Sequence, residues 1–271
     1  MRLTAARGVT LVELLVAMAM ASVIAGTAFA GLIQAGRVTD RIVRREGEER
    51  LAAEVVAVLE ALGQHLRYPV ILGDTALHGD LRIGVGVACH GAPSATTLAP
   101  TVPGALAAMT LIADAPLPGD QLSVYVTSSD GVDTATWESV RVLDVTMPSA
   151  LEGCGPTSAF VPVLDRGTGV LRLSHGQSLG GPASGAPVEL YREVRVVVYH
   201  AGTSGWMVGL RSCVDARCGP AQPIVGPVRS PRDSGLRFML TDRREPITIA
   251  VRVPGSATLH SGVIPALGAR F

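Results

Sequence analysis

The sequence predicts an α+β fold in which one long N-terminal helix precedes a head domain rich in β-strands. Three observations carry this prediction. Residues 9–33 form a nearly continuous apolar run, and residues 9–68 contain no proline, as an uninterrupted helix requires. Beyond Pro69, apolar and β-branched residues alternate repeatedly between turns rich in glycine and proline, which is typical of short antiparallel strands.

The overall composition excludes several functions. The chain has 271 residues, and its 23 basic side chains balance 23 acidic ones. This neutrality disfavours a strongly basic nucleic-acid-binding face, so we expect no nucleic-acid partner for this chain. Every basic residue is arginine, and the lack of lysine excludes P-loop, Schiff-base and Ser-Lys chemistry, which need an amine.

Residues 9–33 carry Glu13 as their only charge. A helix of this length is roughly 37 Å long, enough to cross a hydrocarbon layer of about 30 Å. A core helix of a soluble protein would show a regular polar face, and none is present, so we expect this segment to lie in the membrane. Ser22, Gly26 and Ala30 form a small-residue stripe suited to close helix packing, although alanine and glycine are abundant throughout.

An ordinary signal peptide is the main alternative for this apolar run. Arg2 and Arg7 precede it, and it ends in Ala28-Phe29-Ala30, a pattern that signal peptidase cuts. Cleavage after Ala30 would release a soluble exported binding protein. The run is longer than the usual apolar core of about 7 to 15 residues. In addition, inserting a carboxylate into a membrane costs about 2.5 to 3.5 kcal/mol, so the presence of Glu13 in this run requires a functional reason.

The residues around Glu13 supply that reason. The stretch Gly8-Val9-Thr10-Leu11-Val12-Glu13 resembles the cleavage and methylation motif of type IV pilins and type II secretion pseudopilins. The resemblance implies that residues 1–8 are a leader peptide and that a prepilin peptidase cuts between Gly8 and Val9. It also implies methylation of the new Val9 amine and retention of residues 9–33 as a transmembrane and assembly helix in inner-membrane lipid.

The spacing within this motif has a physical logic. Cleavage creates a cationic amine on Val9, four residues before Glu13, so both charges share one helical face. Within one helix, or between staggered subunits, this amine offsets the cost of burying Glu13. The resemblance implies the second arrangement, with other pilin or pseudopilin subunits as partners. A glutamate merely tolerated near a helix end by snorkelling is the alternative.

The helix is predicted to continue as an amphipathic segment over residues 34–68 and to end before Pro69. One apolar stripe runs along it, made of Leu51, Val55, Leu59, Leu62 and Leu66. Five arginines between Arg37 and Arg50 would by the positive-inside rule keep the following domain in the cytoplasm. They alternate with acidic residues, so we follow the resemblance and expect the head in the periplasm or at the cell surface.

Residues 69–271 are predicted to form the β-rich, pilin-like head, with residues 89–104 as a loop. Strand-like segments occur at 122–127, 140–145, 170–173, 188–200, 206–212, 236–240 and 247–253. The C-terminal pattern of larger minor pilins, the PilW-like or GspJ-like group, is resembled by the succession of Tyr199, Leu210-Arg211, Val225-Gly226-Pro227-Val228, Leu236-Arg237-Phe238 and the last of these strands. Pro227 departs from that pattern by interrupting its Gly-Val pair.

All four cysteines, Cys89, Cys154, Cys213 and Cys218, lie in the head. An even count in an exported domain indicates disulfides, with three possible connectivities. We favour Cys213 with Cys218 and Cys89 with Cys154. A metal site using His90 beside Cys89 is the alternative, but the paired C-x-x-C spacing of zinc sites is missing, so we expect no metal and no cofactor.

Two further motifs are weaker. Residues 176–180 match G-x-S-x-G around Ser178, but a Gly/Ser/Pro-rich stretch follows where a nucleophile elbow needs a helix. A serine hydrolase using Ser178 therefore stays an alternative, and we expect no catalytic residues. The acidic turn at residues 129–133, with Glu138, falls short of a full calcium-loop pattern. The function predicted is a minor pilin or pseudopilin, a non-enzymatic subunit of a type IV pilus or type II secretion pseudopilus.

Overall fold

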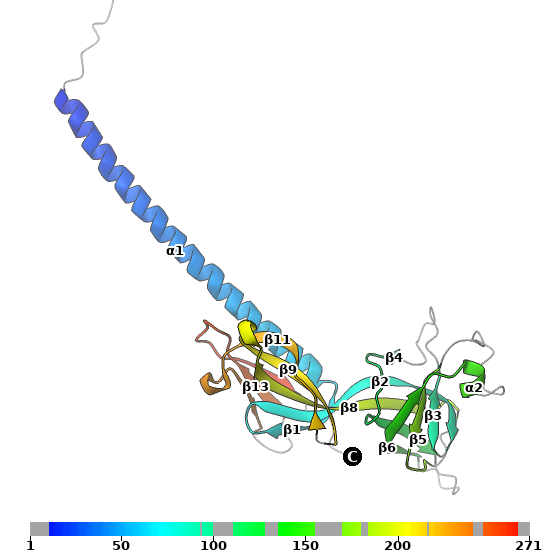
Figure 1. Cartoon of the computed structure of the whole chain (residues 1–271). Coiled ribbons are helices and arrows are strands. Elements are labelled where there is room, and N and C mark those ends of the chain that lie inside the picture. The colour runs from blue at the N-terminus through cyan, green and yellow to red at the C-terminus, as the bar shows by residue number, and fades with distance from the viewer. Residues whose placement is uncertain are drawn as a thin grey trace, which may run out of the picture. The chain divides into compact units, whose positions relative to one another are not determined.

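The computed structural model describes residues 11–92, 94–99, 111–127, 135–154, 170–179, 184–215, 217–240 and 246–264. A long helix, α1 (Leu11–Gly63), is followed by antiparallel strands (Figure 1), which confirms the predicted α+β class. The chain divides into two compact units, residues 1–51 and residues 52–271. The first unit contains most of α1, and the second contains its last turns together with the head.

Within the first unit, α1 presents its apolar side chains outward. Leu11 is 76% exposed and Leu32 71% exposed. Among the described residues, α1 is the one helix long and apolar enough to cross a membrane. Both hydroxyl groups between residues 11 and 33 are satisfied by the helix itself, because Ser22 Oγ donates to the Met18 carbonyl and Thr27 Oγ1 to the Ile24 carbonyl. This part of α1 is therefore compatible with a lipid environment.

The helix ends at Gly63, which corrects the predicted end at Tyr68. The predicted apolar stripe extended to Leu66, which does lie four residues after Leu62 but is buried in the first strand. Gly63, the last residue of the helix, lies close to Ile264, because a Cβ on Gly63 would be 2.5 Å from Ile264 Cγ2. Leu66 thus fits both the helical spacing of the apolar stripe and the burial of a strand residue, and in the structure it belongs to the strand.

Strand β1 (Leu66–Leu72) therefore contains Tyr68 and Pro69. Its pairing with β2 shifts register between Arg67 and Val70. Proline is tolerated at such an irregular point because it has no amide hydrogen to donate to the ladder. Tyr68 adopts a positive φ of 53° there, a conformation that is uncommon for a residue with a side chain.

The head is built from two antiparallel sheets. Within the described residues, the larger contains β1, β2 (Ala76–Ala92), β3 (Ala95–Leu98), β4 (Leu111–Ile112), β5 (Gln121–Thr127), β6 (Ala135–Thr146), β7 (Arg172–His175), β8 (Pro187–His200), β9 (Trp206–Val214), β10 (Arg217–Cys218) and β11 (Gln222–Val228). The smaller contains β12 (Leu236–Met239), β13 (Ile247–Val251) and β14 (His260–Ile264). Short helices lie between strands: α2 (Ala150–Cys154), η2 (Gly202–Ser204) and η3 (Pro231–Asp233).

Part of the larger sheet closes on itself. Its strands form a ring through the pairs β2–β3, β3–β7, β7–β6, β6–β5, β5–β8 and β8–β2, all antiparallel. Apolar side chains fill this barrel, and those at most 1% exposed include Leu98, Leu122, Val142, Leu173 and Leu190. The long strands β2 and β8 continue beyond the barrel, where they pair with β1 and β9. They are therefore shared by both parts of the head.

The last turns of α1 pack on β14. Val55 and Leu59 of the predicted stripe are buried. Glu60 Oε1 accepts a hydrogen bond of 2.7 Å from the Val263 amide. At Gly262, a Cβ would lie 2.3 Å from Val56 Cγ1, so glycine permits this close approach.

Every predicted strand segment overlaps a strand, but the loop predicted at residues 89–104 is wrong where the structure describes it. Strand β2 runs to Ala92, and β3 covers Ala95–Leu98. Thr96 and Thr97 are both buried, at 0% and 1% exposure. Small and hydroxyl-bearing residues therefore occupy core positions here, and they erase the polar–apolar alternation on which the prediction depended.

Candidate assembly segment and a pocket on the head

The residues predicted for processing, Gly8 and Val9, lie outside the described residues. Glu13 lies within α1, but its side chain is also outside the description. Cleavage before Val9 and the pairing of its amine with Glu13 therefore stay predictions.

The small-residue stripe of α1 is open to a partner. Ser22, Gly26 and Ala30 are all exposed. A Cβ placed on Gly26 would meet no atom of the described residues within 4 Å, and the same holds for Gly31 and Gly36. A second helix would therefore meet no bulky side chain at these positions.

The four cysteines form two disulfides, in the pairs favoured from the sequence. Cys89 bonds to Cys154 across 65 residues, and Cys213 bonds to Cys218 across five. Cys89 and Cys154 are buried in a small core with Ala99 and Val170. Their thiols are consumed by the bond and offer no ligand to the alternative metal site.

Ser178 is exposed just after β7, whereas His175 is 2% exposed. The imidazole Nε2 lies 3.3 Å from Thr96 Oγ1, and Nδ1 lies 2.9 Å from the Gln177 carbonyl oxygen. His175 is thus engaged by other groups, and these two residues do not assemble a nucleophile and base. The acidic turn at residues 129–133 lies outside the described residues.

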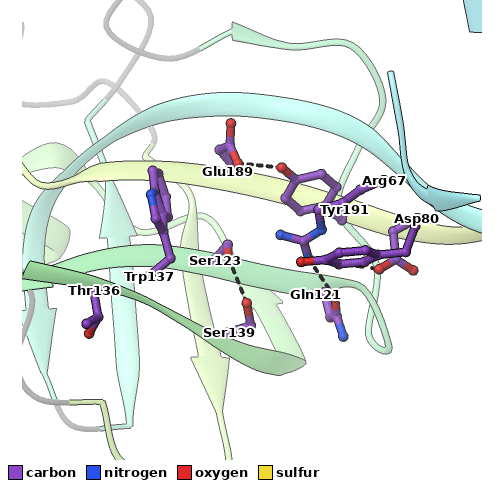
Figure 2. Close-up of a pocket in the computed structure, with 10 residues that line it drawn as sticks. Arg67, Asp80, Gln121, Ser123, Thr136, Trp137, Ser139, Glu189 and Tyr191 are labelled. Carbon is purple, nitrogen blue, oxygen red and sulfur yellow. Dashed lines mark hydrogen bonds and ion pairs between the residues drawn. The ribbon is translucent and has the colours of Figure 1, made fainter. Parts of the chain in front are cut away.

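A polar pocket of about 790 Å³ lies on the head. Its lining comes from five strands, β1, β2, β5, β6 and β8 (Figure 2), and consists of Arg67, Tyr68, Asp80, Gln121, Ser123, Thr136, Trp137, Ser139, Glu189 and Tyr191. The strand register places several of these residues side by side. Gln121 pairs with Tyr191, and Ser123 lies between Glu189 and Ser139.

Alternation along β5 explains why this face is polar. Leu122 and Val124 point into the barrel and are fully buried, so Gln121 and Ser123 face the pocket. The Ser123 and Ser139 hydroxyls are 2.7 Å apart and share a hydrogen bond (Figure 2).

One side of the pocket is organised by Arg67. The guanidinium carbon lies 3.8 Å from the Tyr191 ring centroid and 5.0 Å from that of Tyr68. Nη2 donates a 3.2 Å hydrogen bond to Gln121 Oε1 and lies 3.9 Å from Asp80 Oδ2. Cation–π contacts and hydrogen bonding thus fix the arginine in place.

Burial raises the pKa of Tyr191 well above its usual value, and the hydrogen bond that its hydroxyl donates to Glu189 raises the pKa further. The phenol therefore remains protonated at physiological pH and acts as a donor to the carboxylate. Burial also raises the pKa of Asp80, although the positive charge of Arg67 acts in the opposite direction.

The sequence prediction did not find this pocket. A signal exists in the alternation Gln121-Leu122-Ser123-Val124-Tyr125, which marks a strand with a polar outer face. That pattern does not tell which other strands lie beside it, and the pocket needs all five.

These features describe a chain whose N-terminal helix is suited to a membrane and whose β-rich head is held by disulfides. Residues 3–29 match the family model of the prokaryotic N-terminal methylation motif. The chain thus carries a prepilin-type N-terminal motif followed by a long apolar helix, as in type IV pilin-like proteins. Comparisons with curated proteins and with solved structures gave no significant match.

Proposed function

We propose that this protein is a minor pilin or pseudopilin, a structural subunit that a prepilin peptidase processes and that assembles through its N-terminal helix. The observation that carries the proposal is the methylation motif at residues 3–29. This motif begins before α1 and includes the first exposed apolar residues of that helix, from Leu11 to Phe29.

The proposed mechanism begins with removal of residues 1–8 at the cytoplasmic face of the inner membrane. The apolar part of α1 holds the subunit in lipid until neighbouring helices replace the lipid. Glu13 then sets the axial register, because its charge is most stable where the Val9 amine of a neighbouring subunit lies close.

The head is proposed to lie in the periplasm or at the cell surface. The two disulfides support this location, because such bonds persist in oxidising compartments and are rare in the cytoplasm. The minor-pilin assignment rests on the resemblance of the C-terminal strand pattern, which includes β9, β12 and β13.

A charge-removal variant tests the assembly step. We expect Glu13→Ala to insert into the membrane but to enter filaments at least about tenfold less, since the amine loses its partner. The matched control is Glu46→Ala, because Glu46 is exposed on the charged part of the same helix. Quantitative immunoblots of membrane and sheared-filament fractions give the two amounts. Equal filament entry of Glu13→Ala and Glu46→Ala would contradict the proposed pairing.

A further inference from the structure

We propose that the pocket on the outer face of β5, β6 and β8 binds a neutral carbohydrate, with room for one or two pyranose rings of a glycan. This inference goes beyond the assembly role. It concerns only residues of the head, so binding and filament entry are tested separately.

The pocket has the size that such a ligand needs. Its volume of about 790 Å³ falls within the range of about 300 to 1,000 Å³ typical of small-molecule sites. Because the strands of the barrel and the adjoining sheet supply its walls, it is formed before any ligand arrives.

Aromatic rings are partly exposed at this polar site. Trp137 is 48% exposed and Tyr68 is 39% exposed, so both rings offer accessible apolar surface at the pocket. Trp137 is oriented by an edge contact with Tyr125, whose ring centroid lies 5.5 Å away. The C–H faces of a pyranose pack on flat aromatic surfaces of this kind, while its hydroxyls stay free for polar contacts.

The neighbouring polar groups match sugar hydroxyls. The exposed Ser139 hydroxyl can donate and accept, as a sugar hydroxyl does, and the exposed Gln121 carries both an amide donor and a carbonyl acceptor. Ser123 is only 1% exposed and orients the Ser139 hydroxyl through their shared hydrogen bond. Their alignment in one register across β5 and β6 presents a row of such groups beside Trp137 (Figure 2).

The charges in the pocket are already matched, which favours an uncharged ligand. Arg67 is held by Gln121 and lies near Asp80. Glu189 accepts from Tyr191 and lies 3.6 Å from Arg82. An ionic ligand would have to disrupt one of these pairs and leave one of its charged side chains unpaired. A neutral polyol would add hydrogen bonds and leave the pairs intact.

Isothermal titration of the full-length protein in lipid nanodiscs tests this proposal, since glycoside detergents would compete for the site. The neutral probes are cellotriose, maltotriose and triacetylchitotriose, and the charged probes are sialyllactose and trilysine. We expect saturable binding of at least one neutral probe with a Kd of about 1 mM or tighter. Trp137→Ala should raise that Kd at least about tenfold.

The matched control is Trp206→Ala, because Trp206 is the other tryptophan of the chain and does not line the pocket. Its Kd should stay within about twofold of the unmodified protein. A Ser139→Tyr variant, which fills the pocket from an exposed strand position, should abolish binding even if Trp137→Ala fails to fold. Thermal melts of each variant identify any folding defect.

Three results would overturn the proposal. They are no heat of binding for any neutral probe up to about 20 mM, retained binding in folded Ser139→Tyr, and tighter binding of a charged probe than of every neutral one. None of these results bears on filament entry, which the Glu13→Ala experiment measures separately.

Discussion

At the level of single residues, Arg192 holds the segment before β5 against β8. Its Nε and Nη2 donate to the two carboxylate oxygens of Asp120, both at 2.9 Å, and Nη2 also donates to the Ala115 carbonyl. The Arg192 and Asp120 side chains are only 7% and 3% exposed. The hydrogen bonds to Asp120 raise the pKa of Arg192, so this side chain stays charged in the folded protein.

We expect Arg192→Met to lower the free energy of unfolding by about 3 to 5 kcal/mol, because it leaves the Asp120 carboxylate buried without a positively charged partner. Arg237→Met is the matched control. Arg237 lies 3.5 Å from Asp74 in a pair whose side chains are 47% and 60% exposed, so its loss should cost less than about 1 kcal/mol. Urea denaturation measures the free energy of unfolding of both variants. Equal decreases would show that burial of the ion pair does not determine its contribution to stability.

Asp80 gives a prediction about pH. Since burial raises its pKa above the usual 3.8, the folded state retains a proton that the unfolded state has already released. The contribution of Asp80 to stability therefore declines as the pH rises from 3.8 through its folded-state pKa. Asp80→Asn should be at least as stable as the unmodified protein at neutral pH and should show a shallower decline. Thermal melts across the acidic range measure both curves, and parallel curves would disprove the assignment.

At the level of elements, the contact between α1 and β14 depends on glycine. A Cβ on Gly262 would lie 2.3 Å from Val56 Cγ1 and 2.5 Å from Glu60 Oε1. We expect Gly262→Ala to reduce the free energy of unfolding by about 1 to 3 kcal/mol through overpacking. Gly219→Ala is the control, because within the described part of the chain its Cβ would meet only Ser212 O, at 3.7 Å. Chemical denaturation measures the free energy of unfolding of both variants. An unchanged value for Gly262→Ala would mean that the close contact between α1 and β14 does not contribute to stability.

The elements also show what the sequence was able to predict. Strand β8 has strongly alternating residues and was predicted almost to its ends, and β5 likewise. The end of α1 and the pair β2–β3 do not follow from the sequence pattern. Leu66, Thr96 and Thr97 lie in strands because they pair with residues far away in the sequence.

The same distinction applies to the candidate sites. The processing motif is a contiguous stretch of sequence, so it was recognisable without any structure. The pocket joins Arg67 to Trp137 and Tyr191, and only the register of β5 with β6 and β8 brings such residues together.

At the level of the whole molecule, the two disulfides close loops of very different length. The Cys89–Cys154 bond spans 65 residues and the Cys213–Cys218 bond spans five. Chain entropy alone predicts losses of about 4 and about 2 kcal/mol when each pair is replaced by alanines. Denaturation of the two double variants under oxidising conditions measures this difference. A larger loss from the shorter loop would refute the entropic explanation.

The central claim is that the protein is processed as a pilin and keeps its apolar helix. The most direct measurement is the intact mass of the full-length protein after co-expression with a prepilin peptidase, with Gly8→Val as the uncleaved control. We predict a mature chain that begins with N-methylated Val9, and an unprocessed chain for Gly8→Val. A mature chain beginning at Gly31, or no cleavage of the unmodified protein, would contradict the account.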